Sequence, residues 1–352
     1  MSRPAVVKLG GDALATPQRI AAAADRVARR CRERPAVVVA SARRGVTDHL
    51  LGLVEQVRAA TARDAEVSLA GRVAADRAVA SGEVVAASLL AVALEHVGVP
   101  AVVLDAREAG LVSDGRVGGA TLRHVRPARL ERLLAAGRVP VVAGFQGWYR
   151  GRVTTLGRGG SDITAVTLAV ALGAAWCELV KEPGALHTAD PRLISEARPV
   201  NRAGHRFLTE LAWSGARVIH HLAAERAERE GMALRFTSLH PDGEPTTDVS
   251  ETWRLEPVES IVLAPGHRGM EPETHEETDV STVTVVSGRT DPGDHHAAIA
   301  DRLGHTLRAV RRPHAVSFLT RAWHGEALLR ALHANLVAGG GPATLERRLN
   351  AG

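Results

Sequence analysis

The sequence predicts an α/β protein with a largely parallel central sheet sandwiched by helices, followed by a small α+β domain. Over about the first 240 residues, short apolar runs alternate with longer helix-like segments, the order that builds parallel sheets. The runs are apolar throughout rather than alternating, as in strands buried on both faces. A polar, Pro-containing stretch then interrupts the pattern, and a shorter strand–helix–strand–helix series follows.

The apolar runs are the expected strands of a first domain, residues 1–240. They read "AVVKLG", "PAVVVASA", "PAVVLDA", "VPVVAGF", "CELVKE" and "MALRFTS". Helical character is expected between them, in "PQRIAAAADRVARRCRER", "VTDHLLGLVEQVRAATA", "DAEVSLAGRVAADRAVASGEVVAASLLAVALEHVG", "PARLERLLAAG" and "SDITAVTLAVALG".

The remaining chain is expected to form a second, smaller domain. Residues 241–256 are polar and contain Pro and Gly, which is typical of a linker. Residues 257–340 contain the strand-like runs "VESIVLA", "STVTVVSG" and "HAVSFLT" and the helix-like runs "HHAAIADRLG" and "GEALLRALHANL". Residues 341–352 are expected to be a loose tail.

Composition argues against several classes of protein. We find no run of about 18 apolar residues, so no membrane span is expected. The N-terminal residues lack the apolar core of a signal peptide. The two cysteines, Cys31 and Cys177, are too few for a disulfide framework or a four-ligand zinc site. The sequence therefore predicts a cytoplasmic protein without a metal site of its own.

The net charge of +5 raises the question of nucleic-acid binding. Arginines, however, are interspersed with Ala and acidic residues in helical stretches such as "RVARRCRERP" and "HLAAERAERE". Aromatic residues make up 3% of the chain, too few for a platform on which bases stack. We interpret these arginines as solvated helix faces and expect no nucleic-acid partner.

Lysine is nearly absent from the chain. Lys8 and Lys181 are the only two, although Lys and Arg together number 44. A compact ammonium suits a transferring phosphate better than a planar guanidinium does. The two lysines are therefore candidate phosphate ligands, and chance retention is the alternative.

Two glycine-rich turns precede expected helices, "VKLGGDA" and "LGRGGSD". Such turns bring backbone N–H groups to a helix N-terminus, where anions bind. Neither a GxxxxGK[ST] motif nor a strand–GxGxxG–helix unit is present, which argues against P-loop and dinucleotide folds. Each turn taken singly is also explained by the conformational freedom of glycine. Together with a lysine, the two turns suggest phosphoryl transfer.

Taken in order, several stretches resemble the aspartate kinases of the amino-acid kinase superfamily. They run from residue 4 to about residue 237 and include "VKLGGDALA", "SARRGVTDHLL", "TTLGRGGSD", "TADPR" and "GARVIHHLAAERA". "TTLGRGGSD" with a downstream "TADPR" is specific to that branch. The resemblance implies the amino-acid kinase fold and a Mg²⁺- and ATP-dependent phosphorylation of the side-chain carboxylate of L-aspartate to 4-phospho-L-aspartate.

The resemblance implies catalytic roles for four residues. Lys8 stands at the lysine of the family's K-F-G-G-T-S loop and would neutralise charge on the γ-phosphoryl group. Gly10 and Gly11 would offer backbone donors to the same group. Asp162 resembles the aspartate that orients this lysine. Positioning and electrostatics of this kind are nearly all that a phosphoryl-transfer catalyst needs.

Five residues match the family's amino-acid pocket. Arg158 resembles the arginine that holds the α-carboxylate, and Glu83 the acid that meets the α-amino group. Ser41 and Thr47 match hydroxyl positions that hydrogen-bond the substrate, and Ser161 lies in the same "GGSD" turn. Each residue alone also fits an ordinary cap or surface charge, so their joint occurrence carries the assignment.

The sequence departs from the family's pattern in two loops. Asp12 and Ala13 replace hydroxyl residues beside the phosphate turn, and an aspartate there should repel a triphosphate unless it turns outward or helps to hold magnesium. The nucleotide loop reads "KEPGALHTADPR", with Gly184 in place of an aspartate. The residues expected to bind nucleotide are Lys181, Glu182, His187, Asp190, Arg192 and, in place of a usual lysine, Arg217.

The C-terminal region resembles one ACT unit, a small amino-acid-binding module, with a remnant of a second where aspartate kinases normally carry two. A homodimer or higher homo-oligomer is expected. Two alternatives stay open: a kinase for a related amino or carboxylic acid or with altered nucleotide preference, and an inactive homologue that only binds an amino acid. Retention of Lys8 and Asp162 favours an enzyme.

Overall fold

The computed structural model describes residues 2–61, 67–240, 242–251, 259–264, 268–270, 277–287, 308–312, 314–321 and 324–336. The chain divides into two compact units. The first consists of Met1–Gly184 and Glu225–Asp248, and the second of Ala185–Ala224 and Val249–Gly352. The segment Ala185–Ala224, expected in the first domain, therefore groups with the C-terminal part, because Ala189 and Ile194 lie in the hydrophobic core of that unit.

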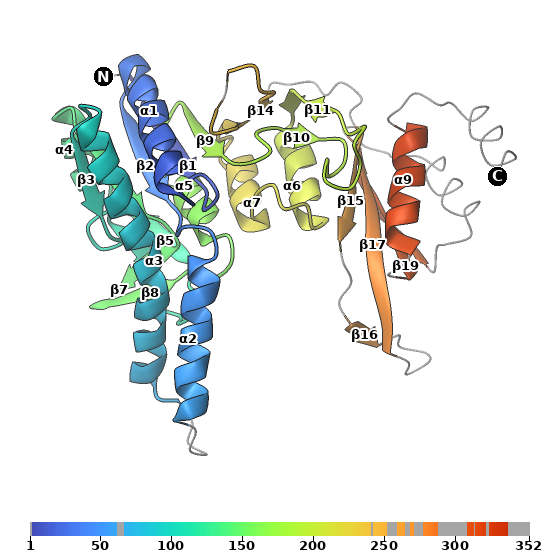
Figure 1. The fold of residues 1–352 in the computed structure, drawn as a ribbon, viewed down its shortest axis with the longest axis horizontal. Helices are drawn as coiled ribbons and strands as arrows, with labels where there is room; N and C mark the ends of the chain where they lie inside the picture. Colours follow the sequence, from blue (N-terminus) through green and yellow to red (C-terminus); the bar gives the residue numbers. More distant parts are fainter. Residues whose placement is uncertain are drawn as a thin grey trace, which may run out of the picture. The chain divides into compact units, whose positions relative to one another are not determined.

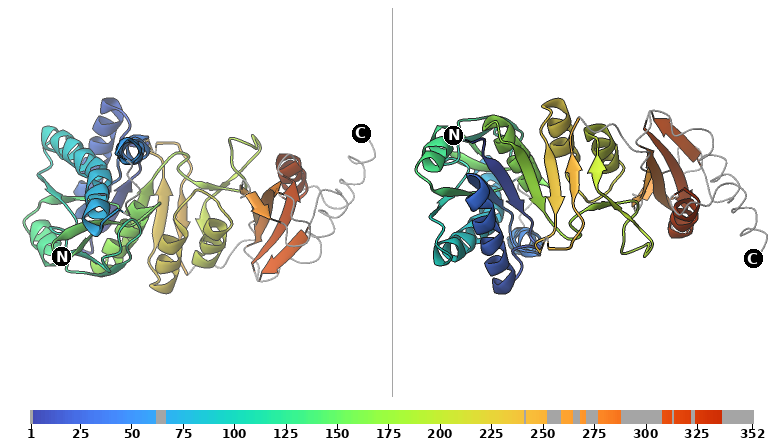
Figure 2. Two further views of the ribbon diagram at one scale, coloured as in Figure 1. Left: turned by 90° about the horizontal axis from the view of Figure 1, so that it is seen from below. Right: turned by 90° about the horizontal axis from the view of Figure 1, so that it is seen from above.

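The central sheet of the first unit has the strand order β14–β13–β9–β1–β2–β6–β3 (Figures 1 and 2). Every pairing from β13 to β3 is parallel, as the apolar strand pattern predicts. The bounds are β1 Ala5–Leu9, β2 Ala36–Ala40, β3 Ala101–Leu104, β6 Val139–Ala143, β9 Trp176–Val180, β13 Leu234–Thr237 and β14 Thr247–Val249. Strand β14 lies within the stretch expected to be a linker.

Five helices of the first unit have the bounds α1 Pro17–Glu33, α2 Val46–Ala60, α3 Leu69–His96, α4 Ala128–Ala135 and α5 Gly160–Ala171. Thr16 caps α1 by accepting a hydrogen bond from the Arg19 amide at 3.3 Å. Helices α1 and α3 share one core with Val7 and Leu9 of β1. Successive strand side chains point to opposite faces, so Lys8 points to the other face, where it meets Asp162 of α5.

Helix α3 is the one helix among the described residues that is long and apolar enough to cross a membrane by length and composition. It has 28 residues, and its most apolar window has a mean hydropathy of 1.7. Half of that window is buried inside the structure, where α3 packs against α1, β3, β6 and β8. A long core helix passes the same test, so the test is weak support for a membrane span.

A small second sheet of the first unit was not expected from the sequence. Its order is β5–β4–β7–β8, with β4 Leu111–Ser113, β5 Leu122–Val125, β7 Gln146–Tyr149 and β8 Arg152–Thr155. Its strands are only three or four residues long, too short for a periodic pattern to show. The buried Asp76 of α3 holds this sheet by accepting hydrogen bonds from the Thr155 amide at 2.9 Å and the Gly118 amide at 3.0 Å.

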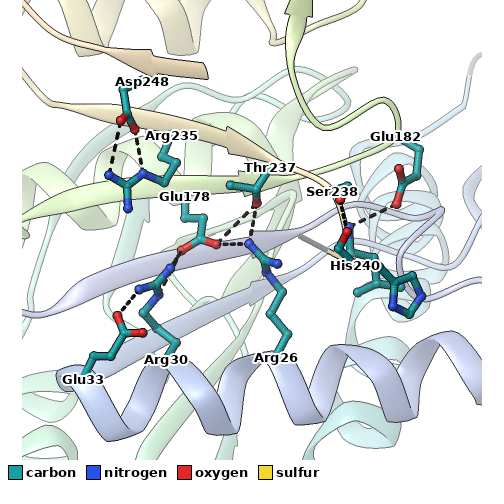
Figure 3. A network of polar contacts seen from close by, with 11 residues as sticks. Arg26, Arg30, Glu33, Glu178, Glu182, Arg235, Thr237, Ser238, His240 and Asp248 are labelled. Carbon is teal, nitrogen blue, oxygen red and sulfur yellow. Dashed lines mark hydrogen bonds and ion pairs between the residues drawn. The ribbon is translucent and has the colours of Figure 1, made fainter. Parts of the chain in front are cut away.

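The expectation that the arginines of "RVARRCRERP" are solvated is wrong for two of them (Figure 3). Arg26 is 6% exposed and pairs with Glu178 of β9, which is 1% exposed. Arg30 reaches the other Glu178 oxygen at 2.9 Å. Burial alone would raise the pKa of Glu178, but the two guanidinium groups outweigh it and lower that pKa. A buried carboxylate requires such partners. The glutamate inside the apolar run "CELV" was therefore the sequence signal that some arginines are buried.

The second unit contains an antiparallel sheet in the order β15–β17–β19–β18, with β16 paired to β17. Helix α9 packs on β15 and β17, which agrees with the expected α+β domain. The expected helix "HHAAIADRLG" and the tail 341–352 lie outside the described residues. The bounds are β15 Glu259–Ala264, β16 Arg268–Met270, β17 Glu277–Ser287, β18 Arg308–Arg312, β19 Ala315–Arg321 and α9 Gly325–Leu336.

Shorter elements complete the region after β9. They are β10 Leu186–His187, β11 Pro199–Val200, β12 Arg202–Ala203, α6 His205–Trp213 and α7 His221–Arg229. Strands β10 and β11 pair antiparallel, and the Ser250 amide donates to the Ala203 carbonyl of β12 at 3.3 Å.

Candidate functional site

The carboxyl ends of the parallel strands share one edge of the central sheet, and the predicted residues of the first unit gather there. Gly10 and Gly11 follow β1, Ser41 follows β2, and Lys181 follows β9. In open α/β sheets, ligands bind outside this edge, because loops from several strands converge on it. The topology thus collects side chains from distant parts of the sequence.

Lys8 and Asp162 form an ion pair at this edge. The Lys8 Nζ lies 2.8 Å from the Asp162 Oδ1, and each side chain is 16% exposed. Lys8 comes from β1, and Asp162 comes from the first turn of α5. The pair holds an ammonium in a fixed place with part of its surface open to a ligand, as the resemblance implied.

The glycines after β1 have different roles. A Cβ added to Gly11 would lie 2.7 Å from the Ala42 carbonyl oxygen, so only glycine allows this loop to contact the loop after β2. The Gly11 carbonyl in turn accepts from the Arg44 amide at 3.1 Å. A Cβ on Gly10 would have only ordinary contacts, one of them to the Lys8 Nζ at 3.6 Å.

Backbone donors are available beside the ammonium. The Gly10 amide donates to the Val180 carbonyl at 3.3 Å, whereas the Gly11 amide has no acceptor among the described residues. The next two amides, of Asp12 and Ala13, also lack one in the described part of the chain. The amides of residues 11–13 are therefore candidate donors to an anion, although Ala13 itself is 1% exposed.

The N-terminus of α5 supplies a second set of donors. Gly157 and Gly159 adopt left-handed φ angles of 75° and 70°, which glycine accommodates without strain. No side chain caps this helix, and within the described residues the Ser161 amide has no acceptor. An uncapped N-terminus carries partial positive charge, so anionic groups are stabilised there. Arg158 lies in the same turn, exposed and without an ion pair to any described residue.

Glu83 of α3 is buried at the same edge. It is 3% exposed, and its Oε1 accepts a hydrogen bond from the Ala42 amide at 3.2 Å. Its Oε2 is buried without a partner among the described residues. Burial raises the pKa of Glu83 to about 7, although the Ala42 hydrogen bond opposes the shift. A buried oxygen with no donor is costly, and a ligand ammonium would satisfy it.

The hydroxyl residues of the predicted pocket lie in the loops around this edge. The Ser41 amide donates to the Leu9 carbonyl at 3.1 Å, which ties the loop after β2 to β1. Thr47 is half-buried in the first turn of α2. Ser161 is 8% exposed, and a Cβ on Gly144 would lie 2.8 Å from its Oγ. Ser41 thus follows β2, and Thr47 and Ser161 lie in the first turns of α2 and α5.

Asp12, the unexpected acid beside the phosphate turn, is directed to the surface. Its Oδ1 lies 3.2 Å from the Arg44 Nη1, and the two side chains are 50% and 78% exposed. A pair this exposed is strongly screened by water, and the arginine offsets the charge of Asp12. The carboxylate therefore turns outward, which was one of the two possibilities left by the sequence.

The start of the predicted nucleotide loop is held against the end of β13 (Figure 3). Glu182 accepts a hydrogen bond from the Leu239 amide at 3.1 Å, and the half-buried Lys181 donates its amide to the Thr237 carbonyl at 3.0 Å. A Cβ on Gly184 would lie 2.1 Å from the Ser238 nitrogen. The close backbone contact explains why glycine, and not the family's aspartate, occupies position 184.

The other predicted nucleotide residues belong to the second unit, so the structure does not place them against Lys8. Asp190 binds Arg192 through two hydrogen bonds of 2.9 and 2.6 Å. Hydrogen bonding to Arg192 lowers the pKa of Asp190 and raises that of Arg192. The His187 Nδ1 lies 3.0 Å from the Ala185 carbonyl oxygen, and Arg217 is exposed.

Known proteins resemble this chain in sequence. A 236-residue stretch is 40% identical to the aspartokinase of Thermus thermophilus, which covers 66% of this chain and 56% of that protein. The aspartokinase of Mycobacterium tuberculosis is 36% identical over 262 residues, 73% of this chain and 60% of that protein. The chain thus spans a little over half the length of the curated relatives it matches.

Solved structures share the fold. E. coli aspartokinase III in complex with aspartate and ADP has a TM-score of 0.78 at 20% identity and covers 94% of this chain and 99% of that chain. Aspartate kinase from Synechocystis has a TM-score of 0.61 at 26% identity, covering 94% of this chain and 68% of that chain. The profile of the amino acid kinase family matches residues 3–238. Because this match covers more than half of the sequence, the chain belongs to the amino acid kinase family.

Proposed function

We propose that this protein is an ATP-dependent kinase that phosphorylates the side-chain carboxylate of L-aspartate to give 4-phospho-L-aspartate. The observation that carries the proposal is the Lys8–Asp162 ion pair on the strand that leads into residues 11–13, whose amides have no acceptor in the described part of the chain. Both similar curated proteins described above are aspartokinases.

The reaction requires little covalent chemistry from the protein. An oxygen of the substrate carboxylate attacks the γ-phosphorus of ATP, the new P–O bond forms, and the bond to the β-phosphate oxygen breaks to release ADP. Lys8 neutralises charge that accumulates on the γ-phosphoryl oxygens. The amides of residues 11–13 and of Ser161 donate hydrogen bonds to phosphate oxygens. Fixed donors of this kind stabilise the transition state without having to reorganise.

The amino-acid pocket recognises both backbone charges of aspartate. Glu83 accepts hydrogen bonds from the α-ammonium through the Oε2 that is otherwise unpartnered. Arg158 binds the α-carboxylate with its guanidinium fork. The hydroxyl groups of Ser41, Thr47 and Ser161 donate to the substrate carboxylates. When Glu83 holds the α-ammonium and Arg158 holds the α-carboxylate, the side-chain carboxylate of aspartate faces Lys8.

Magnesium would enter with the nucleotide rather than occupy a protein cage. No group of three or more His, Cys, Asp or Glu side chains that could hold a metal ion occurs within the described residues. This fits Mg²⁺, which keeps several waters and binds through nucleotide phosphates and one or two carboxylates. Asp162 is the carboxylate at the Lys8 end of the pocket that would contribute. The ion would supply positive charge to the phosphates.

The test is acyl-phosphate formation trapped with hydroxylamine, with purified protein, ATP, Mg²⁺ and L-aspartate. We expect aspartyl hydroxamate from the wild-type protein and a loss of at least about 100-fold in Lys8→Ala, since one preorganised electrostatic contact contributes that much. Glutamate as acceptor and GTP as donor serve as specificity controls. Folded wild-type protein that yields no hydroxamate with aspartate and either donor would refute the proposal.

A further inference from the structure

From Ala185 onward, the predicted nucleotide loop belongs to the second unit. Ala189 and Ile194 of this loop belong to one buried cluster with Val283 of β17, Phe318 of β19 and Leu329 of α9. The Ile261 amide of β15 donates to the Thr188 carbonyl at 2.8 Å. The backbone of the "TADPR" stretch is therefore positioned by the sheet and helix of the second unit.

Thr188 is the polar centre of this attachment. It is 7% exposed, and all of its polar atoms are engaged. Its amide donates to the Arg198 carbonyl at 2.9 Å, and its Oγ1 accepts from the Arg198 amide at 2.9 Å. The remaining partner of the hydroxyl is the His333 Nε2 at 3.0 Å. Thr188 thus joins both sides of the loop to α9.

His333 is the residue of α9 that hydrogen-bonds to Thr188. Its side chain is 2% exposed, and burial lowers its pKa, with Glu196 opposing the shift and Arg198 favouring it. This environment therefore favours the neutral form of the imidazole. Because the Thr188 Oγ1 already accepts one hydrogen bond, its own hydrogen is available for a neutral Nε2. Loss of the ring would leave the buried hydroxyl without this partner.

We propose that His333 is a positioning residue for nucleotide binding. It acts through Thr188, two residues before Asp190 and four before Arg192, and so fixes the section of loop that carries these two side chains. This inference rests on the proposed kinase function and on the assignment of this loop to nucleotide that the family resemblance implies. It gives the C-terminal unit a role in nucleotide affinity that does not require an effector.

The test separates positioning from general stabilisation. His333→Ala removes the hydrogen bond, Thr188→Val removes it from the other side, and His333→Gln retains a polar group at that reach. Leu332→Ala is the control for packing, because Leu332 is fully buried in the same cluster as Ala189 and Ile194 but its side chain has no group that could hydrogen-bond to Thr188. Steady-state KM values for ATP and for aspartate are measured, together with amide hydrogen exchange of residues 186–198 in ligand-free protein.

We expect His333→Ala to raise the KM for ATP about three- to tenfold, the effect of one net hydrogen bond. Thr188→Val should raise it at least as much, because it also removes the hydrogen bond from the Arg198 amide. The KM for aspartate and kcat should change less than about twofold, exchange of residues 186–198 should accelerate, and His333→Gln should recover part of the ATP affinity. The double variant should lose no more ATP affinity than Thr188→Val alone, because Thr188→Val already removes the His333 contact together with the hydrogen bond from the Arg198 amide.

Two results would overturn the inference while the kinase function stands. One is an unchanged KM for ATP in both variants. The other is an equally large rise in the KM for ATP in Leu332→Ala, which would mean that the effect comes from a loss of core packing and not from the hydrogen bond. If wild-type protein forms no hydroxamate, the kinase function fails and this role fails with it, so the two failures are told apart by the wild-type assay.

Discussion

Replacing Glu83 by glutamine should stabilise the ligand-free protein while weakening substrate binding. Burial raises the pKa of Glu83 from an ordinary value of 4.5 to about 7. Between these two pH values the folded protein retains a proton that the unfolded chain has released. The free energy of unfolding must therefore fall as pH rises through this window. A shift of this size corresponds to about 3 kcal/mol, since one pKa unit is about 1.4 kcal/mol.

Glutamine has the same shape as the protonated acid and does not ionise. The difference in unfolding free energy between Glu83→Gln and wild type should be close to zero at pH 4. It should grow between about pH 4.5 and pH 7 and approach about 3 kcal/mol above pH 8. Urea unfolding at a series of pH values measures it. Glu131→Gln, an exposed carboxylate on α4, is the control and should stay within about 0.5 kcal/mol of wild type throughout.

Substrate should narrow this difference in unfolding free energy. The ammonium of L-aspartate would pair with ionised Glu83, so saturating aspartate should stabilise wild type at pH 8 more than it stabilises the variant. The KM for aspartate should rise about 10- to 100-fold in Glu83→Gln, the cost of losing one charged hydrogen bond. A stability difference that does not depend on pH, or an unchanged KM, would refute the assignment of Glu83 as a buried carboxylate that awaits an ammonium.

Three further predictions each compare two substitutions that should differ in the size of their effect. Gly11→Ala should destabilise the fold by about 1–3 kcal/mol through a backbone clash, whereas Gly10→Ala should stay within about 1 kcal/mol in urea unfolding; equal effects would contradict the loop geometry. Glu178→Gln should lower the free energy of unfolding by about 3–5 kcal/mol, because it leaves buried guanidinium charge uncompensated. Glu33→Gln, on the exposed side of the same network, should lower it by less than about 1 kcal/mol. Arg158→Lys should raise the KM for aspartate less than Arg158→Ala does, and a lysine variant as impaired as alanine would mean that the bidentate geometry, not charge, dominates.

Most of the central fold was predictable because its signals are local. The run "AVVVA" is buried at every position in β2, and an apolar run of that length has few alternatives to an inner strand. Helix α1 begins at Pro17 after its Thr16 cap, as a proline in the first turn favours. The strands β4, β5, β7 and β8 escaped prediction because three or four residues do not establish a period.

The candidate site was predictable in its residue types but not in its electrostatics. The resemblance of "TTLGRGGSD" to the family motif indicated Asp162 as the partner of Lys8, and the Asp162 Oδ1 lies 2.8 Å from the Lys8 Nζ. Nothing in the sequence showed that one Glu83 oxygen is buried without a donor, because burial depends on how α3 packs beside the loop after β2. The outward turn of Asp12 likewise depends on Arg44, which comes from a different loop.

Residue patterns along the chain established the strand and helix series, the two glycine turns and the scarcity of lysine, because each of these is a property of neighbouring residues. The burial of Arg26 against Glu178, the glycine required at position 184 and the grouping of the nucleotide loop with α9 all arose from contacts between distant segments. Such contacts depend on the distance between backbones after folding, and no local pattern encodes that distance. Tertiary packing therefore decided that the Arg26 and Glu178 charges are buried and that the predicted nucleotide loop groups with α9.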